Sequence, residues 1–169
     1  MISTLLIPTD GDAIVNGHSV VKEPEKVRQC ITYLPDEAGA YKNMTGEKYL
    51  RFMAGLFSTD IDTINGYVER AKNMCGLGER LQDKIGSYSR GMIRKLLLSR
   101  AVMTKPALAI LDEPTSQLDP IAATDFLQTL GRINRELGTT ILICEHRLED
   151  VIPMANRLLI LDKGELIAD

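Results

Sequence analysis

The sequence has 169 residues, of which 44% are hydrophobic and 25% are charged. These proportions are ordinary for one globular domain, and they exclude a disordered, collagen-like or disulfide-rich chain. With 20 basic and 23 acidic residues the net charge is −3, which argues against a nucleic-acid coat or a binder of anionic membranes. The apolar runs, such as 141–144 and 158–161, are far shorter than the roughly 20 residues of a membrane-spanning helix.

Three widely spaced cysteines, Cys30, Cys75 and Cys144, are odd in number. This pattern indicates reduced thiols of a cytoplasmic protein, not a disulfide framework. Because Cys144 closes an apolar run, we expect it to be a small buried residue.

In the first half of the chain, Asn16-Gly17 between two short apolar runs predicts a β-hairpin. The β-prone run Ile31–Leu34 predicts a short strand. Two helices are expected at about 46–57 and 62–75, and Gly76 ends the second.

The second half holds three largely apolar runs, at 107–111, 139–144 and 158–161. Such runs are typical of strands that are buried on both faces of a parallel sheet. Between the first two, Asp119-Pro120 opens a helix to about Leu137, with aspartate as the N-cap and proline at the first helical position. Alternating strands and helices predict an α/β fold.

Ionisable pairs follow two of these runs, Asp112-Glu113 after the first and Glu145-His146 after the second. In open α/β sheets, ligands bind outside the carboxyl ends of the strands. A carboxylate there suits Mg²⁺, a second can polarise a water, and a histidine can donate to a phosphoryl group. An isolated acidic pair more often only leaves a buried strand, so the interpretation depends on the other motifs.

A basic segment lies at 79–105, with seven basic and two acidic side chains. Ser89 is the expected N-cap of a helix that runs to about Met103, and a helix N-terminus attracts phosphate. The local excess of positive charge fits a visiting anion. A solvated basic helix face is the alternative.

Four motifs follow one another along the chain: Tyr-Ser-Arg-Gly-Met at 88–92, Leu-Ala-Ile-Leu-Asp-Glu-Pro at 108–114, Ser-Gln-Leu-Asp-Pro at 116–120, and His146. This ordered set resembles the ATP-binding-cassette (ABC) ATPases, the engine domains of ABC transporters. There the motifs are the signature motif, the Walker B strand, the D-loop and the switch histidine. The resemblance covers nearly the whole chain and implies an α/β fold: a parallel-sheet P-loop NTPase-like core, incomplete here, with an α-helical subdomain.

The resemblance implies ATP and Mg²⁺ as ligands and a role for each residue near them. Asp112 would hold Mg²⁺, Glu113 would be the general base on the attacking water, and His146 would sense the γ-phosphate. Asp36 stands where the family's Q-loop, here at 31–37, has glutamine. A carboxylate can still meet Mg²⁺, but it cannot donate a hydrogen bond as an amide does.

The same resemblance implies a head-to-tail dimer around two nucleotides. Ser89, Arg90 and Gly91 would contact the ATP that the second ABC subunit holds, and Ser116 and Asp119 would communicate across the interface. Arg90 departs from the family pattern, which has a glycine that lets the backbone approach the ligand closely. A cation in the first helical turn is also unfavourable by about 0.3–1 kcal/mol.

The family's phosphate loop, Gly-x-x-x-x-Gly-Lys-Ser/Thr, is missing from this sequence, which contains no Gly-Lys pair. That loop grips the β- and γ-phosphates. Residues 1–6 resemble the tail of the helix that follows the loop, so we interpret the chain as N-terminally truncated, without any Walker A residue. We expect weak or no ATP hydrolysis by the chain alone, and a gap or unpaired edge in the sheet.

We expect three parts: 1–37, an N-terminal core remnant with the hairpin and the Q-loop-like segment; 38–88, the helical subdomain; and 89–169, the signature helix with the Walker B, D-loop and switch-histidine core. The Tyr-Ser-x-Gly-Met form resembles the branch that powers exporters. The leading hypothesis is therefore an ATPase subunit that docks on a transmembrane subunit at the cytoplasmic face of the membrane, with no nucleic acid as partner. The alternatives are a non-catalytic partner that completes the ATP site of an intact subunit, and a soluble ABC protein of translation or DNA repair.

Overall fold

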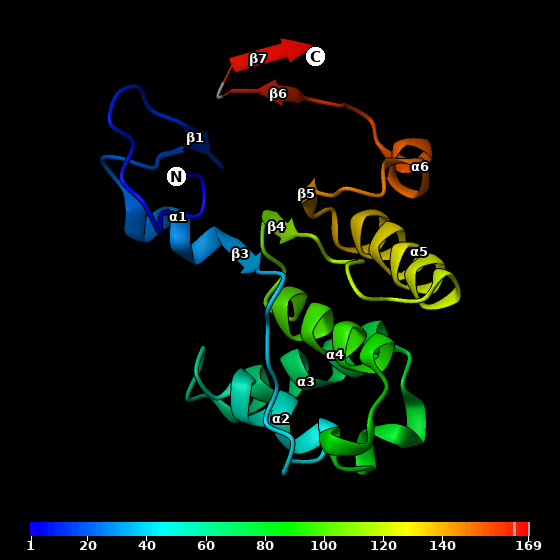
Figure 1. Ribbon diagram of the computed structural model, residues 1–169. Coiled ribbons are helices and arrows are strands. Elements are labelled where there is room, and N and C mark those ends of the chain that lie inside the picture. Colours follow the sequence, from blue (N-terminus) through cyan, green and yellow to red (C-terminus); the bar gives the residue numbers. More distant parts are fainter. Residues whose placement is uncertain (164, 169) are drawn as a thin grey trace.

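The computed structural model describes residues 1–163 and 165–168. Its centre is a three-stranded parallel sheet in the order β3-β4-β5 (Figure 1). The strands are Ile31–Leu34, Leu108–Asp112 and Thr140–Cys144. Leu111 of β4 lies between Leu34 of β3 and Ile143 of β5. The predicted α/β fold with a parallel sheet is therefore confirmed.

The described residues also form helices. They are α1 (Pro24–Cys30), α2 (Gly46–Ala54), α3 (Ile61–Cys75), α4 (Arg90–Val102), α5 (Pro120–Leu137) and α6 (Leu148–Val151), with short 3-10 turns η1 (Gly78–Gln82), η2 (Ile85–Ser87) and η3 (Ile152–Met154). Helix α4 packs on α3, on α5 and on β3, so it lies between the α2–α3 layer and the sheet (Figure 1).

Capping residues explain where the long helices begin and end. The Ser89 hydroxyl accepts from the Met92 amide at 3.2 Å, and the Asp119 carboxylate accepts from the Ala122 amide at 2.9 Å. These bonds satisfy amides that have no partner inside the helix. Helix α5 ends at Gly138, whose φ of 66° lies in the left-handed region that favours glycine. The predicted starts of both helices and the end of α5 are confirmed.

Leucine and aromatic side chains fill one main core between the sheet and the helices. Its fully buried members include Tyr49, Leu50, Leu96, Leu97, Leu98, Leu111, Phe126 and Ile133. A smaller apolar cluster of Val15, Val20 and Val27 lies between the N-terminal hairpin and α1. Helix α4 contributes to the main core along most of its length, which fixes its position against the sheet.

The predicted hairpin is present as β1 (Ile14–Val15) and β2 (His18–Ser19). Asn16 and Gly17 have φ angles of 50° and 83°, and positive φ at both central residues defines the type I′ turn that Asn-Gly favours. The helix α1, which follows it, was not predicted. It has only seven residues and buries only Val27, so the segment is too short to show the hydrophobic periodicity that predicts a helix.

Four expectations are wrong. The runs 107–111 and 139–144 are not buried on both faces, because β4 alternates between buried and partly exposed residues and every residue of β5 is at least partly exposed. The run 158–161 does not join the parallel sheet, because β6 (Ile160–Asp162) pairs antiparallel with β7 (Glu165–Ala168) and both strands are exposed. Residues 1–6 form turns instead of a helix tail. Cys144 is exposed, although all three cysteines are free thiols as expected. An apolar run favours a strand, but the available neighbours decide whether that strand is buried.

Within residues 1–163 and 165–168, no helix combines the length and the apolar composition needed to cross a membrane.

The strand β5 has one open edge. It pairs with β4 on one side, and its other edge pairs with no strand among the residues that the structure describes. Ile141 and Ile143 pack on the core, so the alternating residue Leu142 points to the opposite face. The outer edge of β3 also pairs with no described strand, as expected for an open sheet, so the edge or gap expected from a missing strand stays a prediction.

We predict that the purified chain self-associates through the open edge of β5, because unpaired strand N–H and C=O groups are a template for another strand. Leu142→Lys places a charge on the edge strand without touching the core face, and it should lower the associated fraction about twofold or more. Light scattering after size-exclusion chromatography at several concentrations measures this. Gln128→Lys, at an exposed position of α5, is the control. A wild-type chain that stays monomeric throughout contradicts the prediction.

Candidate active site

The carboxyl ends of β4 and β5 bring the predicted acid and histidine together. His146 Nε2 lies 2.9 Å from Glu113 Oε1. The His146 side chain is 86% exposed and that of Glu113 is 37% exposed. The pair therefore lies at the surface, where a bound nucleotide can reach both groups.

Glu113 stands on a tight turn directly after β4. Its φ is 43°, a left-handed conformation that costs a non-glycine residue free energy. Two backbone bonds hold the turn: the Glu113 amide donates to the Cys144 carbonyl at 2.9 Å, and the Ser116 amide donates to the Glu113 carbonyl at 3.0 Å. Strain of this kind is characteristic of functional turns, because the surroundings must compensate it.

Asp112 receives a hydrogen bond that the sequence analysis missed. The Tyr33 hydroxyl, on β3, donates to Asp112 Oδ2 at 3.1 Å. Burial raises the pKa of Tyr33, and the hydrogen bond and negative charge of Asp112 raise it further. The phenol therefore stays protonated at neutral pH and remains a donor that fixes the Asp112 carboxylate.

The donor chemistry at this edge fits Mg²⁺ that arrives with a phosphate ligand. Asp112 offers one carboxylate, and the described part of the chain holds no group of three or more potential ligands that would form a closed metal centre. Mg²⁺ is typically bound by one or two carboxylates together with waters and substrate phosphates. Asp112 is the residue that would hold it.

Arg94 of α4 is 7% exposed and connects the two loops that flank the site. Its guanidinium donates to the backbone carbonyls of Pro35 at 3.1 Å and Asp36 at 2.8 Å. It also donates to the carbonyls of Glu113 at 2.9 Å and Pro114 at 3.0 Å. Sequence reasoning counted Arg94 only as part of a basic segment, because a single arginine carries no motif.

Asp36 is held by the protein itself. One carboxylate oxygen, Oδ1, lies 3.4 Å from Arg94 Nη2 and also accepts the hydroxyl hydrogen of Ser116. Burial lowers the pKa of Arg94, while the negative charges of Asp36, Glu145 and Asp112 act in the opposite direction. Asp36 is thus a partner of Arg94 and Ser116, and its metal role remains a prediction.

Glu145, the residue before the histidine, fixes the same loop from β5. Its Oε1 accepts from the Thr115 amide at 2.7 Å and from the Thr115 hydroxyl at 2.5 Å. Thr115 is fully buried. The Glu145-His146 pair was singled out in the sequence, but only the structure shows that its two members face different partners.

Ser89, Arg90 and Gly91 open α4. Ser89 is the N-cap, Arg90 is exposed in the first turn, and Gly91 lies against α5. A Cβ added to Gly91 would lie 3.1 Å from the Ala122 Cβ, which is tighter than ordinary contact. Gly91 therefore has a packing role in addition to any contact with a ligand. Of the two D-loop residues, Asp119 caps α5 and Ser116 contacts Asp36.

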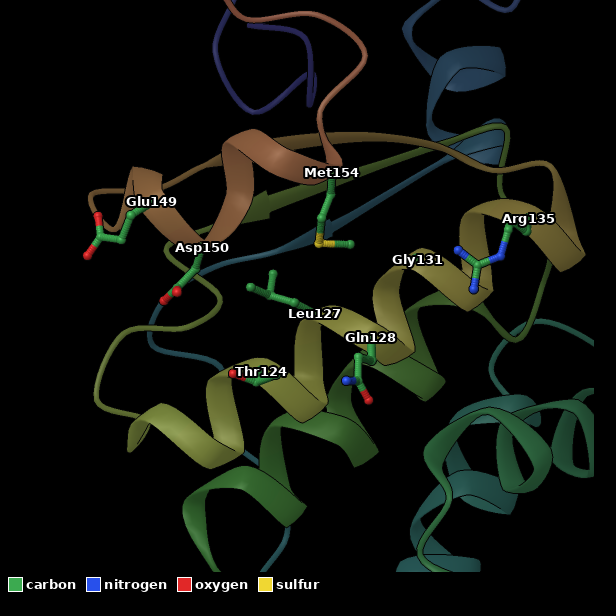
Figure 2. A pocket seen from close by; sticks show the side chains of 8 residues that line it. All are labelled: Thr124, Leu127, Gln128, Gly131, Arg135, Glu149, Asp150 and Met154. Atoms are coloured by element: carbon green, nitrogen blue, oxygen red, sulfur yellow. The ribbon is translucent and has the colours of Figure 1, made fainter.

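A surface groove lies elsewhere, between α5 and the segment of α6 and η3 (Figure 2). Leu127 of α5 and Met154 of η3 line its apolar part, with Arg135 at one end and Glu149 and Asp150 at the other. None of the predicted site residues lines this groove, so the candidate active site is the exposed edge at Glu113 and His146.

An ABC transporter family model matches residues 1–116, and the chain belongs to this family. It is 34% identical over 168 residues to the linearmycin resistance ATP-binding protein LnrL of Bacillus subtilis (strain 168), covering 99% of this chain and 54% of LnrL. It is 30% identical over 168 residues to the ABC transporter ATP-binding protein NatA of the same organism, covering 99% of this chain and 68% of NatA.

It is also 33% identical over 177 residues to the daunorubicin/doxorubicin resistance ATP-binding protein DrrA of Streptomyces peucetius, covering 100% of this chain and 51% of DrrA. The chain thus spans about half the length of LnrL and DrrA. Its fold resembles cbiO1 from Clostridium perfringens, part of the ABC transporter complex cbiONQ. The TM-score is 0.89 at 22% identity, covering 99% of this chain and 68% of that one.

We predict that Thr115→Val lowers the free energy of unfolding by about 1.5–3 kcal/mol, because it removes a buried hydrogen bond to a charged group while keeping the side-chain shape. Urea denaturation followed by circular dichroism measures this.

The matched control is Thr124→Val on the exposed face of α5, where the hydroxyl donates only to the Pro120 carbonyl. We expect a change of about 0.5 kcal/mol or less there. Equal losses at both positions would show that the Glu145 contact adds no stability.

Proposed function

We propose that this chain carries the hydrolysis residues of an ABC transporter ATPase. The observation that supports this best is the 2.9 Å contact between Glu113 and His146 at the end of β4 and β5. Asp112 lies one residue before Glu113. The proposed metal ligand, the proposed base and the proposed hydrogen-bond donor to phosphate thus belong to one exposed edge of a parallel sheet, where ligands of such folds bind.

Each residue has a task that suits its chemistry. The Glu113 carboxylate accepts the proton of the water that attacks the γ-phosphate. His146 donates to the phosphoryl oxygens, where negative charge develops. Asp112, oriented by Tyr33, would hold Mg²⁺, and the ion would supply neutralisation of phosphate charge. His146 contacts Glu113, so the groups proposed to meet the γ-phosphate and the attacking water lie side by side.

The second half of the proposal concerns a partner subunit. The free amides at the start of α4 attract phosphate, so Ser89, Arg90 and Gly91 are assigned to the ATP that a second ABC subunit holds. Ser116 and Asp119 are assigned to the interface between the subunits. We propose that residues 38–88 form the helical part that docks on the membrane subunit. This part lies in sequence between a core remnant at 1–37 and the core at 89–169.

The direction of transport is inferred from relatives. LnrL and DrrA are named as resistance proteins, and resistance by an ABC ATP-binding protein fits the removal of a compound from the cell. We therefore favour an exporter, with ATP and Mg²⁺ as ligands and a transmembrane subunit as partner at the cytoplasmic face of the membrane.

The exposed start of α4, with Ser89 as its N-cap and Arg90 in its first turn, favours a second candidate function. In that role the chain completes the ATP site of a loop-bearing subunit with its own signature residues, while its own site stays silent.

For the chain alone, we predict weak hydrolysis of Mg-ATP that depends on Glu113. Glu113→Gln should lower the residual rate by about 10² or more, because it removes the general base. Phosphate release under single-turnover conditions measures this. Glu149→Gln, at an exposed glutamate of α6, is the control. Turnover near that of an intact ABC ATPase, or a rate that Glu113→Gln leaves unchanged, contradicts the prediction.

For the partner function, we predict that adding the chain raises the hydrolysis rate of a loop-bearing ABC ATPase subunit. Ser89→Arg should return the rate to that of the loop-bearing subunit alone, because the long cation blocks the start of α4. Gln128→Arg, on the exposed face of α5, should keep the gain. No gain with the wild-type chain would argue against this function.

A further inference from the structure

Arg94, on α4, touches both loops of the candidate site. Its guanidinium donates to carbonyls of residues 35 and 36 on one side and of residues 113 and 114 on the other. It also pairs with the Asp36 carboxylate, which in turn accepts from Ser116. Segments that are 58 and 19 positions away in sequence therefore share one donor group.

These four carbonyls belong to loops, so no strand ladder satisfies them. The Glu113 and Asp36 carbonyls also accept from the Ser116 and Ala38 amides, whereas for the Pro35 and Pro114 carbonyls the described residues show Arg94 as the donor. Leaving a buried carbonyl without a donor costs free energy, and a buried charge without partners costs more. The loops and the arginine therefore depend on one another. If α4 shifts against the sheet, several of these bonds break together.

The position of Arg94 on its helix gives this dependence a functional consequence. Arg94 lies four residues after Arg90, the first residue of α4, which is about one helical turn. Ser89 and Gly91 lie in that turn. On the other side, the guanidinium holds the carbonyl of Glu113 itself at 2.9 Å.

We propose that Arg94 is a positioning residue that locks the first turn of α4 to the Glu113 loop. The signature residues and the base of one chain then move as one rigid unit, although they serve two different nucleotides. This inference rests on the proposed function, in which Ser89 and Gly91 contact the partner's ATP and Glu113 serves the chain's own site.

The planar guanidinium is required for this role. It presents five N–H donors in a fixed fork, whereas a lysine ammonium has three donors on one atom. Arg94→Lys keeps the charge, but its single nitrogen cannot reach the carbonyls of both loops at once. The lysine variant therefore separates the geometry of the group from its charge.

Hydrogen–deuterium exchange of the full 169-residue chain tests the lock directly. In Arg94→Lys, amides of residues 113–118 should exchange about tenfold faster or more, while those of residues 96–102 in the buried part of α4 stay protected. The matched control is Arg132→Lys, because Arg132 also donates to backbone carbonyls, those of Asn73 and Met74, far from the site. Equal acceleration of both segments in Arg94→Lys would overturn the proposal.

A functional readout separates positioning from mere folding. In the assay with a loop-bearing subunit, Arg94→Lys should lower the maximal stimulated rate about tenfold, with no change in the chain concentration that gives half of the maximum. A role in folding alone would raise that concentration and leave the maximum unchanged, which would overturn the proposal.

The two proposals can fail separately. If the wild-type chain gives no stimulation, the partner function fails, and the exchange data still decide the lock. If Arg94→Lys stimulates fully and exchanges like wild type, the lock is wrong and the proposed function stands.

Discussion

The buried guanidinium of Arg94 is the constraint on which the rest of the site depends. A charge in a protein interior is tolerated only when hydrogen bonds and an opposite charge replace its water. Here four loop carbonyls and Asp36 provide this replacement. The carbonyls come from the loops that leave β3 and β4, so the arginine also fixes where both strands end and where Glu113 stands.

Arg94 lies in a well-packed body of the molecule, which has weakly packed margins. The body holds the sheet, α2 to α5 and the loops that carry the site, whose Glu113 and His146 side chains reach the surface. The margins are residues 1–13 and the β6–β7 hairpin, in which large apolar side chains such as Leu6, Ile7 and Leu161 are strongly exposed. The catalytic proposal therefore concerns the part of the chain with the strongest internal support. The exposed apolar side chains mark surfaces that favour association.

The chain belongs to the ABC family, and the proposed mechanism relates these contacts to one another. In the proposed mechanism, one chain contributes a base to its own site and a helix N-terminus to its partner's site. The Glu113–His146 pair and the N-cap at Ser89 are the two exposed ends of this arrangement. Arg94 and Glu145 connect the loops between them, and Tyr33 orients Asp112. Arg94 and Glu145, which connect these loops, thus lie outside the family motifs.

The sequence by itself determined the local structure and the motif residues. Asn16-Gly17 predicted its turn, Ser89 and Asp119 predicted their helix starts, and the family motifs identified Asp112, Glu113 and His146 as neighbours. Such features depend on residues that are close in the chain, or on short patterns with a fixed spacing.

Only the tertiary structure decided which distant groups meet. Arg94 reaches carbonyls 19 and 58 positions away, and a backbone carbonyl leaves no mark in the sequence. The exposure of Cys144 and the separation of β6 from the parallel sheet also depend on which elements meet in space. Burial of an apolar strand requires a neighbour in space, and an apolar run predicts the strand but not its neighbour.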